Sequence, residues 1–306
     1  MAITAQDVQK LREMTGVGMM DCKKALSATD GDMDKAVEFL REKGLATAQK
    51  KAGRIAAEGV AYATVIDGVG VVVEVNAETD FVAKNEKFTD FVHTIATVIA
   101  KEAPADLDDL LTKSYPGTGR SVADETIEKV QVIGENIKIR RFQRFEGGVS
   151  VPYVHMGGRI GVLVNLDTDL PSDKVTEVGK DLAMQIAALN PRFLDKSQVG
   201  QDVLDEEKKI MLVQMENDPK MASKPDKVKE GIVMGKLRKF YEENCLMQQE
   251  FVKDGSMSVE QYVAAQAKAL GGSISLKDAV RFEKGEGIEK KQENFAEEVA
   301  AQMNMK

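Results

Sequence analysis

The sequence of this 306-residue chain predicts an α+β fold built around a duplicated β-hairpin unit. Three observations support this prediction. Residues 59–81 align with residues 148–170 without a gap, and nine of the 23 aligned positions are identical. Apolar residues recur at helical spacing within the first 44 residues, and residues 200–247 are charged, rich in methionine and nearly free of strand-forming residues. Because only two copies of the hairpin unit occur, the repeat is a supersecondary duplication and not an extended array.

Residues 1–44 predict a compact module of three helices. Thr4 is a candidate N-cap for the first helix, with Asp7 at the third helical position completing a capping box. Asp32 can cap the third helix, and a single apolar stripe follows it. We expect that helix to end at Gly44, because glycine is the preferred residue just after a helix.

The basic run 50–54 then connects this module to the repeats. We interpret it as a solvated linker, with contact to an acidic or RNA partner as the alternative. Each repeat unit reads as a β-hairpin that runs into a helix. The patterns predict further elements after the two hairpins: an amphipathic helix from Phe88 to Ile99, an exposed loop with a short helix at 104–119, a helix at 121–133, a strand at 136–145, and a helix at 174–189 that Asn190 and Pro191 end.

Residues 200–247 predict two antiparallel helices divided by the segment 219–225. Their apolar residues face each other or a second chain, and the sequence leaves both possibilities open. These residues are Leu204, Ile210, Met211, Val228, Ile232, Leu237, Phe240 and Tyr241. The hairpin interrupts the second repeat lobe, which we expect to resume at about 248–270.

Composition excludes several classes of protein. The chain is 43% hydrophobic and 30% charged, as in ordinary soluble globular proteins, and its longest apolar runs are too short to span a bilayer. The N-terminus lacks a secretory signal and the chain has two cysteines, so we expect a cytoplasmic protein. A net charge of −8 argues against a general nucleic-acid binder, and no membrane association is expected.

The sequence offers little for covalent catalysis. It has two histidines and no phosphate-binding Gly-x-x-x-x-Gly-Lys-Ser/Thr loop, and Cys22 and Cys245 lack the spacing of a zinc site. The start of a calcium loop at 30–34 is rejected, because Lys35 and Arg41 stand where glycine and glutamate are required. We therefore expect no cofactor, no metal and no catalytic residues.

Phe81 is the residue most informative about function. It directly follows Asp80 in a polar connection after an apolar strand, in a chain with 5% aromatic residues and no tryptophan. Connections between elements lie on the surface and carry function more often than the elements do. The repeat supports a second interpretation, in which Phe81 and its equivalent Leu170 are the same core residue in two sizes.

Several stretches together resemble the bacterial elongation factor Ts family, in the family's order and over nearly the whole chain. They comprise residues 11–26, Thr79-Asp80-Phe81-Val82, residues 133–141 and residues 281–290. The resemblance implies a guanine-nucleotide exchange factor for elongation factor Tu that acts without covalent chemistry. It further implies that Asp80 and Phe81 enter the partner near its Mg²⁺ and nucleotide site, where Asp80 orients the loop. The partner-binding residues so implied are Lys23, Thr79, Asp80, Phe81, Val82, Ile133, Gly134, His155 and Val252.

The resemblance also implies a division of the chain. The expected parts are a UBA-like helical module (1–54), core subdomain N (55–140), the first part of core subdomain C (141–190), a coiled-coil dimerisation hairpin (191–247), the remainder of core subdomain C (248–270) and a C-terminal module (271–306). Within the last part, Phe295, Val299 and Met303 predict a helix over Glu293–Met303, laid either on the partner or on this chain's own core.

One departure and two rival functions complete the analysis. Lys253 stands where the family often has methionine, which puts the contact made there in doubt. An RNA-associated or chaperone-like binder would use the basic run and the coiled coil, and its RNA binding would be sensitive to salt and indifferent to Phe81. An enzyme would require a pocket at the paired acids Asp167 and Asp169, which helix capping explains better.

Overall fold

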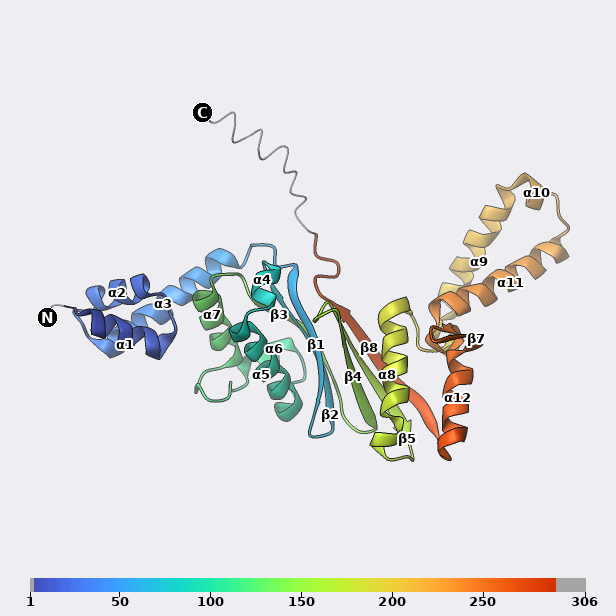
Figure 1. The fold of residues 1–306 in the computed structure, drawn as a ribbon. Coiled ribbons are helices and arrows are strands. Elements are labelled where there is room, and N and C mark those ends of the chain that lie inside the picture. Colours follow the sequence, from blue (N-terminus) through green and yellow to red (C-terminus); the bar gives the residue numbers. More distant parts are fainter. Residues whose placement is uncertain (1–2, 290–306) are drawn as a thin grey trace.

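The computed structural model describes residues 3–289 as an elongated α+β molecule (Figure 1). A three-helix module lies at one end, two three-stranded sheets lie in the middle, and a helical hairpin projects at the other end. The helix predicted over Glu293–Met303 lies outside the described residues. No helix within residues 3–289 is both long enough and apolar enough to cross a membrane.

The N-terminal module consists of α1 (Ala5–Thr15), α2 (Met19–Ala28) and α3 (Met33–Lys51). The predicted capping box of α1 is confirmed: the Asp7 amide donates to the Thr4 hydroxyl, and the Thr4 amide donates to the Asp7 carboxylate. The predicted cap of α3 is also confirmed, since Asp32 accepts from the Lys35 amide. The apolar faces of the three helices enclose a small core that includes Leu11, Cys22, Leu26 and Leu40.

The prediction that Gly44 ends the third helix is wrong, because α3 continues to Lys51. Gly44 lies where α3 crosses a helix of the first lobe. A Cβ atom at Gly44 would lie 2.4 Å from the Gln131 side chain and 3.7 Å from Ile127. Glycine therefore permits a close approach of two helices here, at a cost in helix propensity of about 1 kcal/mol. As a result, Lys50 and Lys51 of the predicted basic linker are the last turn of a helix.

The first lobe is an antiparallel sheet in the order β1-β2-β3, covered on one face by helices. Val71, Val73 and Val75 of β2 face the helical layer, and Phe88 and Phe91 pack on them in the core. The elements are β1 (Glu58–Ile66), β2 (Val69–Ala77), α4 (Asp80–Ala83), α5 (Glu86–Glu102), α6 (Leu107–Thr112), α7 (Val122–Ile133) and β3 (Lys138–Phe145).

The second lobe repeats the arrangement with a sheet in the order β4-β5-β8. Residues 274–283, which the sequence analysis placed in the C-terminal part, form the third strand of this sheet. Charged residues on β8 obscure the alternation of a strand in the sequence. The elements are β4 (Val149–His155), β5 (Ile160–Thr168), α8 (Ser172–Leu189), β6 (Glu250–Phe251), β7 (Asp254–Ser258), α12 (Val259–Leu270) and β8 (Ile274–Glu283).

The two sheets pack face to face through a third apolar layer. Ala61, Val72 and Phe145 of the first sheet contact Leu163 and Phe282 of the second. Each sheet therefore has one face toward its own helices and one face toward the other sheet, which explains the nearly continuous burial of β2 and β5.

A helical hairpin separates the two parts of the second lobe. Its helices are α9 (Gln201–Glu216), α10 (Pro219–Ala222) and α11 (Asp226–Asn244), with short 3₁₀ turns η1 (Lys196–Gln198) and η2 (Leu246–Gln248) at its base. Met211, Leu237 and Phe240 are buried between α9 and α11, whereas Ile210 and Val228 are about half exposed. The apolar residues thus divide between an internal seam and an outer surface.

The glycine that begins each repeat has a structural reason in both copies. Gly59 and Gly148 have φ values of +118° and +73°, and a Cβ atom would lie 2.1 Å from the Val75 carbonyl oxygen in the first copy and 2.6 Å from the Leu166 carbonyl oxygen in the second. Both the backbone conformation and the close approach of the opposite strand require a residue without a side chain.

The variant Gly148→Ala is expected to lower the free energy of unfolding by at least about 1 kcal/mol more than Gly147→Ala. Gly147 has a φ of +75° and open space around its Cβ position, so its variant incurs only the conformational cost. Urea unfolding of both variants, followed by circular dichroism, measures the difference. Equal unfolding midpoints would show that β5 shifts to accommodate the added methyl group and that the close approach of the Leu166 carbonyl oxygen does not require glycine.

Candidate partner-binding site

The one-turn helix α4 carries Phe81 into solvent at the end of the first hairpin. The Phe81 side chain is 81% exposed, the highest value for a large hydrophobic residue within 3–289. The adjacent Val82 is 8% exposed and packs in the core of the first lobe. Because adjacent residues of a helix point in different directions, burial of Val82 directs Phe81 away from the lobe.

The interpretation of Phe81 and Leu170 as equivalent core residues is wrong. Leu170 is half-buried and packs against the core of the second lobe, whereas Phe81 has left the core of the first. In the second copy, Pro171 follows Leu170 and precedes α8 directly, while the first copy inserts α4 before α5. The extra turn changes the direction of the aromatic residue.

Two carboxylates fix the segment that leads into α4. Glu135 Oε2 accepts hydrogen bonds from the amides of Glu78 and Thr79, both at 3.0 Å, and Glu135 Oε1 accepts one from the Thr79 hydroxyl at 2.7 Å. Glu78 Oε1 in turn accepts the Asn136 amide at 2.6 Å. We call these hydrogen-bonded groups the Glu78–Glu135 clasp. It joins the end of β2 to the connection between α7 and β3.

Thr79 and Asp80 have different tasks on this helix. The Thr79 hydroxyl accepts the Val82 amide at 3.4 Å and so caps α4. Asp80 lies in the first turn, and its carboxylate pairs with Lys84 at 3.1 Å while about half of it remains exposed. Since an exposed pair of this kind contributes little stability, Asp80 stays accessible to a partner beside Phe81.

A fully buried carboxylate, that of Glu74, lies two residues before Asn76 on β2. It accepts hydrogen bonds from the Gly285 amide at 2.7 Å, Arg141 Nε at 2.6 Å, Arg140 Nη1 at 3.0 Å and Asn76 Nδ2 at 3.0 Å. Burial by itself would raise the pKa of Glu74, but these donors outweigh burial and hold that pKa below its ordinary value. The ionised carboxylate therefore ties the chain after β8 to the first sheet.

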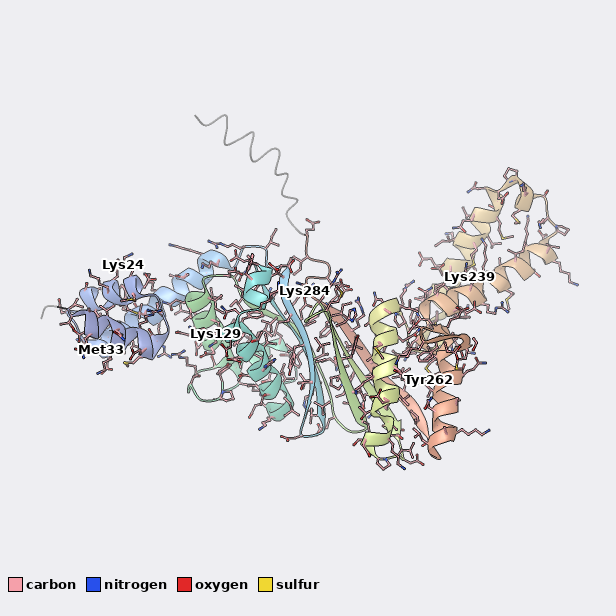
Figure 2. All side chains as sticks on the ribbon, in the orientation of Figure 1. Lys24, Met33, Lys129, Lys239, Tyr262 and Lys284 are labelled. Carbon is pink, nitrogen blue, oxygen red and sulfur yellow. The ribbon has the colours of Figure 1, made fainter. Side chains whose placement is uncertain are left out.

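The same junction contains further contacts between the lobes. Lys284 lies between the two sheets in Figure 2, and its ammonium group pairs with Glu58 of β1. The Arg141 guanidinium lies 4.4 Å from the centre of the Phe282 ring and also pairs with Glu286 at 3.0 Å. These contacts join the end of β8 in the second lobe to the sheet of the first lobe.

Three more predicted site residues lie near the first hairpin. Ile133 is the last residue of α7, and the exposed Gly134 caps that helix with a φ of +90°, immediately before Glu135. The clasp therefore brings both of them beside Thr79. His155 ends β4 half-buried, with its Nδ1 2.9 Å from the Tyr153 hydroxyl. The turn after His155 reaches β1, where the Gly158 carbonyl accepts the Ala61 amide at 2.8 Å.

Lys23 and Val252 are exposed on other parts of the molecule. Lys23 lies on α2 in the N-terminal module, and Val252 is 48% exposed in the turn between β6 and β7 of the second lobe. Neither belongs to the surface around Phe81. The predicted residues thus form one cluster near α4, with His155 on the strand whose turn reaches β1, and two separate points, which a partner could contact together only by extending along the molecule.

Comparison with known proteins decides the family. A family model described as elongation factor TS matches residues 78–286, which is more than half of the chain. The chain belongs to the elongation factor Ts family. Similar relatives named elongation factor Ts include those of Magnetococcus marinus, 46% identical over 98% of both chains, Clostridium kluyveri, 47% identical over 99% of this chain and 100% of the relative, and Clostridium perfringens, 48% identical over 97% and 98%.

The lysine that departs from the pattern of the elongation factor Ts family has a partner within the chain. Lys253 Nζ lies 2.6 Å from Asp181 of α8, and this hydrogen bond raises the pKa of Lys253. Tyr262, labelled on α12 in Figure 2, donates to the same Asp181 carboxylate at 2.6 Å. Burial and then this acceptor raise the pKa of the Tyr262 hydroxyl. Lys253 therefore anchors the turn that carries Val252.

Sequence reasoning missed Glu74, Glu78 and Glu135 at this site of an elongation factor Ts family member. Glu135 lies within the mid-chain stretch that resembles the family, which was the only available signal. Its role depends on contact with Thr79, 56 residues earlier, and a single sequence contains no pattern that pairs them. The acids Asp167 and Asp169 are both exposed, and Asp169 accepts the amide of Ser273, which precedes β8, at 2.7 Å. The expected helix-capping role is wrong, because α8 has no side-chain cap.

Proposed function

We propose that this protein is the guanine-nucleotide exchange factor for elongation factor Tu in translation elongation and that it acts without covalent chemistry. It binds the complex of Tu with GDP, promotes release of GDP and so permits reloading with GTP. Membership of the elongation factor Ts family supports the class of activity. The observation that carries the mechanism is the 81% exposure of Phe81 on a helix that is fixed from beneath.

An exposed phenylalanine on a fixed helix suits insertion into a partner. Its ring is already out of the core, so binding does not require the lobe to unfold, and the ordering cost is small. Asp80 beside it places a carboxylate at the same point, and α4 presents the two residues together. We propose that they enter Tu near its Mg²⁺ and nucleotide site.

Exchange follows from binding linkage. A GTPase holds its nucleotide through backbone amides, a lysine and Mg²⁺ around the phosphates. A factor that binds the empty form better than the loaded form lowers nucleotide affinity, and nucleotide lowers the factor's affinity by the same ratio. Separation of packed side chains near Mg²⁺ by Phe81 provides that difference. No cofactor of this protein is required, since the Mg²⁺ and GDP belong to the partner.

The other proposed contacts extend along the molecule. Ile133 and Gly134 continue the surface around Thr79 and Phe81, while His155, Lys23 and Val252 contact Tu at further points along the molecule. Val82 is buried in the first core, so its proposed contribution is to orient α4. Family membership also supports a UBA-like fold for residues 1–54 and a coiled coil for residues 191–247.

Self-association through the helical hairpin is a further part of the proposal. Ile210, Val213, Val228 and Met234 are 44–68% exposed on α9 and α11, and a second copy would cover them. We propose a cytoplasmic protein that requires neither nucleic acid nor a membrane. A net charge of −8 agrees with a protein partner better than with RNA.

The test is release of a fluorescent GDP analogue from cognate elongation factor Tu, measured by stopped flow against excess unlabelled GDP. The expected result is acceleration by roughly tenfold or more that saturates with factor concentration. Absence of acceleration with the cognate partner would refute the proposed function. Binding of RNA that weakens steeply with salt, in a protein inactive with Tu, would favour an RNA-associated role.

A further inference from the structure

The Glu78–Glu135 clasp is reciprocal, because each carboxylate binds a backbone amide next to the other. Glu135 accepts the amides of Glu78 and Thr79, and Glu78 accepts the amide of Asn136, which follows Glu135. Hydrogen bonds from neutral amides to an ionised carboxylate are short and stronger than those between neutral groups. The clasp therefore fixes residues 78–79 and residues 135–136 relative to each other.

The helix beyond the clasp depends on it. With four residues, α4 is too short to be stable by itself. Its attachments within the described part of the chain include the buried Val82 side chain, the Thr79 cap and the exposed pair of Asp80 and Lys84. The Thr79 hydroxyl that caps α4 also donates to Glu135 Oε1, so the capping group is itself oriented by Glu135.

The connection after the second hairpin is arranged differently from the one that Glu135 binds. There Asp169, the equivalent of Asp80, binds the amide and hydroxyl of Ser273 at 2.7 and 3.0 Å. The acid of that copy is used inside its own lobe, and Leu170 stays against the core. In the first copy Glu135 supplies the acceptor from a different element. Asp80 therefore need not bind a backbone amide of its own lobe as Asp169 does, and Phe81 need not pack on the core as Leu170 does.

We propose that Glu135 is a positioning residue for nucleotide exchange, acting through Phe81. It holds Thr79 and α4 in place, so that Phe81 meets the partner in one orientation. The inference rests on the proposed function. It has a separate consequence, however: removal of Glu135 should impair exchange in the parent protein but not in a variant that lacks the Phe81 side chain.

The main test compares Glu135→Ala with the conservative Glu135→Gln in the GDP-release assay. Alanine removes all three hydrogen bonds, and we expect the maximal release rate to fall about tenfold with a smaller change in the half-saturating concentration. Glutamine can turn its oxygen toward the two amides and its NH₂ group toward the Thr79 hydroxyl. It should therefore retain most of the rate.

A matched control separates positioning from general stability. Asp195 is also a carboxylate that accepts a backbone amide, that of Ser197 at 2.9 Å, and it additionally accepts the Gln248 side chain. A hydrogen bond with the Ser197 side chain, followed by those from the Ser197 amide and Gln248, lowers the pKa of Asp195 to about 2. Asp195→Ala should lower the unfolding midpoint as Glu135→Ala does, but leave the exchange rate unchanged, since it lies at the base of the helical hairpin.

A double-mutant cycle with Phe81→Ala provides the decisive readout. In the Phe81→Ala background, Glu135→Ala should cause no further loss of maximal rate. An equal further loss would show that Glu135 acts independently of Phe81 and would overturn the proposal. An unchanged rate in the Glu135→Ala single variant would also overturn it.

Hydrogen exchange tests the inference without the partner. Glu135→Ala should speed amide exchange in residues 82–85 of the free protein, while protection of β2 stays the same. If the parent protein fails to accelerate GDP release, the proposed function fails, and this measurement still decides whether Glu135 orders α4. Unchanged amide exchange there would reject that role.

Discussion

Replacement of Phe81 with alanine is expected to abolish most of the acceleration of GDP release, a loss of about tenfold or more, with little change in stability. The side chain is 81% exposed, so its removal leaves no cavity in the free protein. In the complex, by contrast, a buried aromatic anchor of an interface carries a large part of the interaction. Stopped-flow release of the fluorescent GDP analogue gives the rate, and thermal unfolding gives the stability.

The repeat offers the opposite variant as a control. Leu170 occupies the equivalent position but packs against the core of the second lobe. Leu170→Ala should lower the free energy of unfolding by about 1–2 kcal/mol, because the residue is only half-buried, and leave exchange intact below the unfolding transition. If Phe81→Ala exchanged nucleotide as fast as the parent, the wedge would be rejected while the exchange function stood.

Replacement of Glu74 with alanine is expected to lower the free energy of unfolding by about 3–5 kcal/mol. The variant leaves Arg140, Arg141 and the Gly285 amide without their shared acceptor in a buried site. It also releases the chain after β8 from the first sheet. Urea unfolding followed by far-UV circular dichroism measures the loss, and hydrogen exchange in β2 locates it.

An exposed pair of the same chemistry is the matched control for Glu74. Glu146 is 71% exposed and pairs with Arg144 at 2.8 Å, so Glu146→Ala should change the free energy of unfolding by less than about 1 kcal/mol. Similar decreases in the free energy of unfolding of the two variants would show that burial of the Glu74 carboxylate does not increase its contribution to stability.

The lowered pKa of Glu74 also predicts a response to acid. A carboxyl group whose pKa is lower in the folded state contributes stability above its ordinary value of 4.5, and that contribution is lost as pH falls through the folded pKa. The parent should therefore lose more stability than Glu74→Ala when the pH is lowered through this range. A parallel loss in both proteins would contradict the assignment.

Local chemistry made much of the fold predictable. The capping box of Thr4 and Asp7 and the cap at Asp32 involve residues three apart, and both are confirmed. The helix found at Val122–Ile133 and the strand at Lys138–Phe145 lie within two residues of their expected bounds. The repeat was visible because two hairpins under the same constraints kept the same residues, including Gly59 and Gly148.

Long-range contacts explain the error at Gly44 and the failure to recognise β8 in the sequence. Gly44 resembles a helix end in sequence, yet it lies inside α3 because α7 approaches it. The strand β8 was not recognised in the sequence because it contains many charged residues. These residues form contacts at the edge of the sheet, such as the pair of Arg159 and Glu283 at 3.3 Å. Propensity describes a segment alone, and packing against another segment overrides it.

The sequence by itself determined the α+β class, the duplicated hairpin, the family resemblance and the choice of Phe81 as the residue to examine. Only the tertiary structure decided that Phe81 points into solvent while Leu170 packs on a core, and that Glu135 forms hydrogen bonds to the segment that leads into α4. The reason is physical. Caps, turns and periodicity arise between residues close along the chain, whereas burial and carboxylate–amide contacts join residues whose proximity exists only after folding.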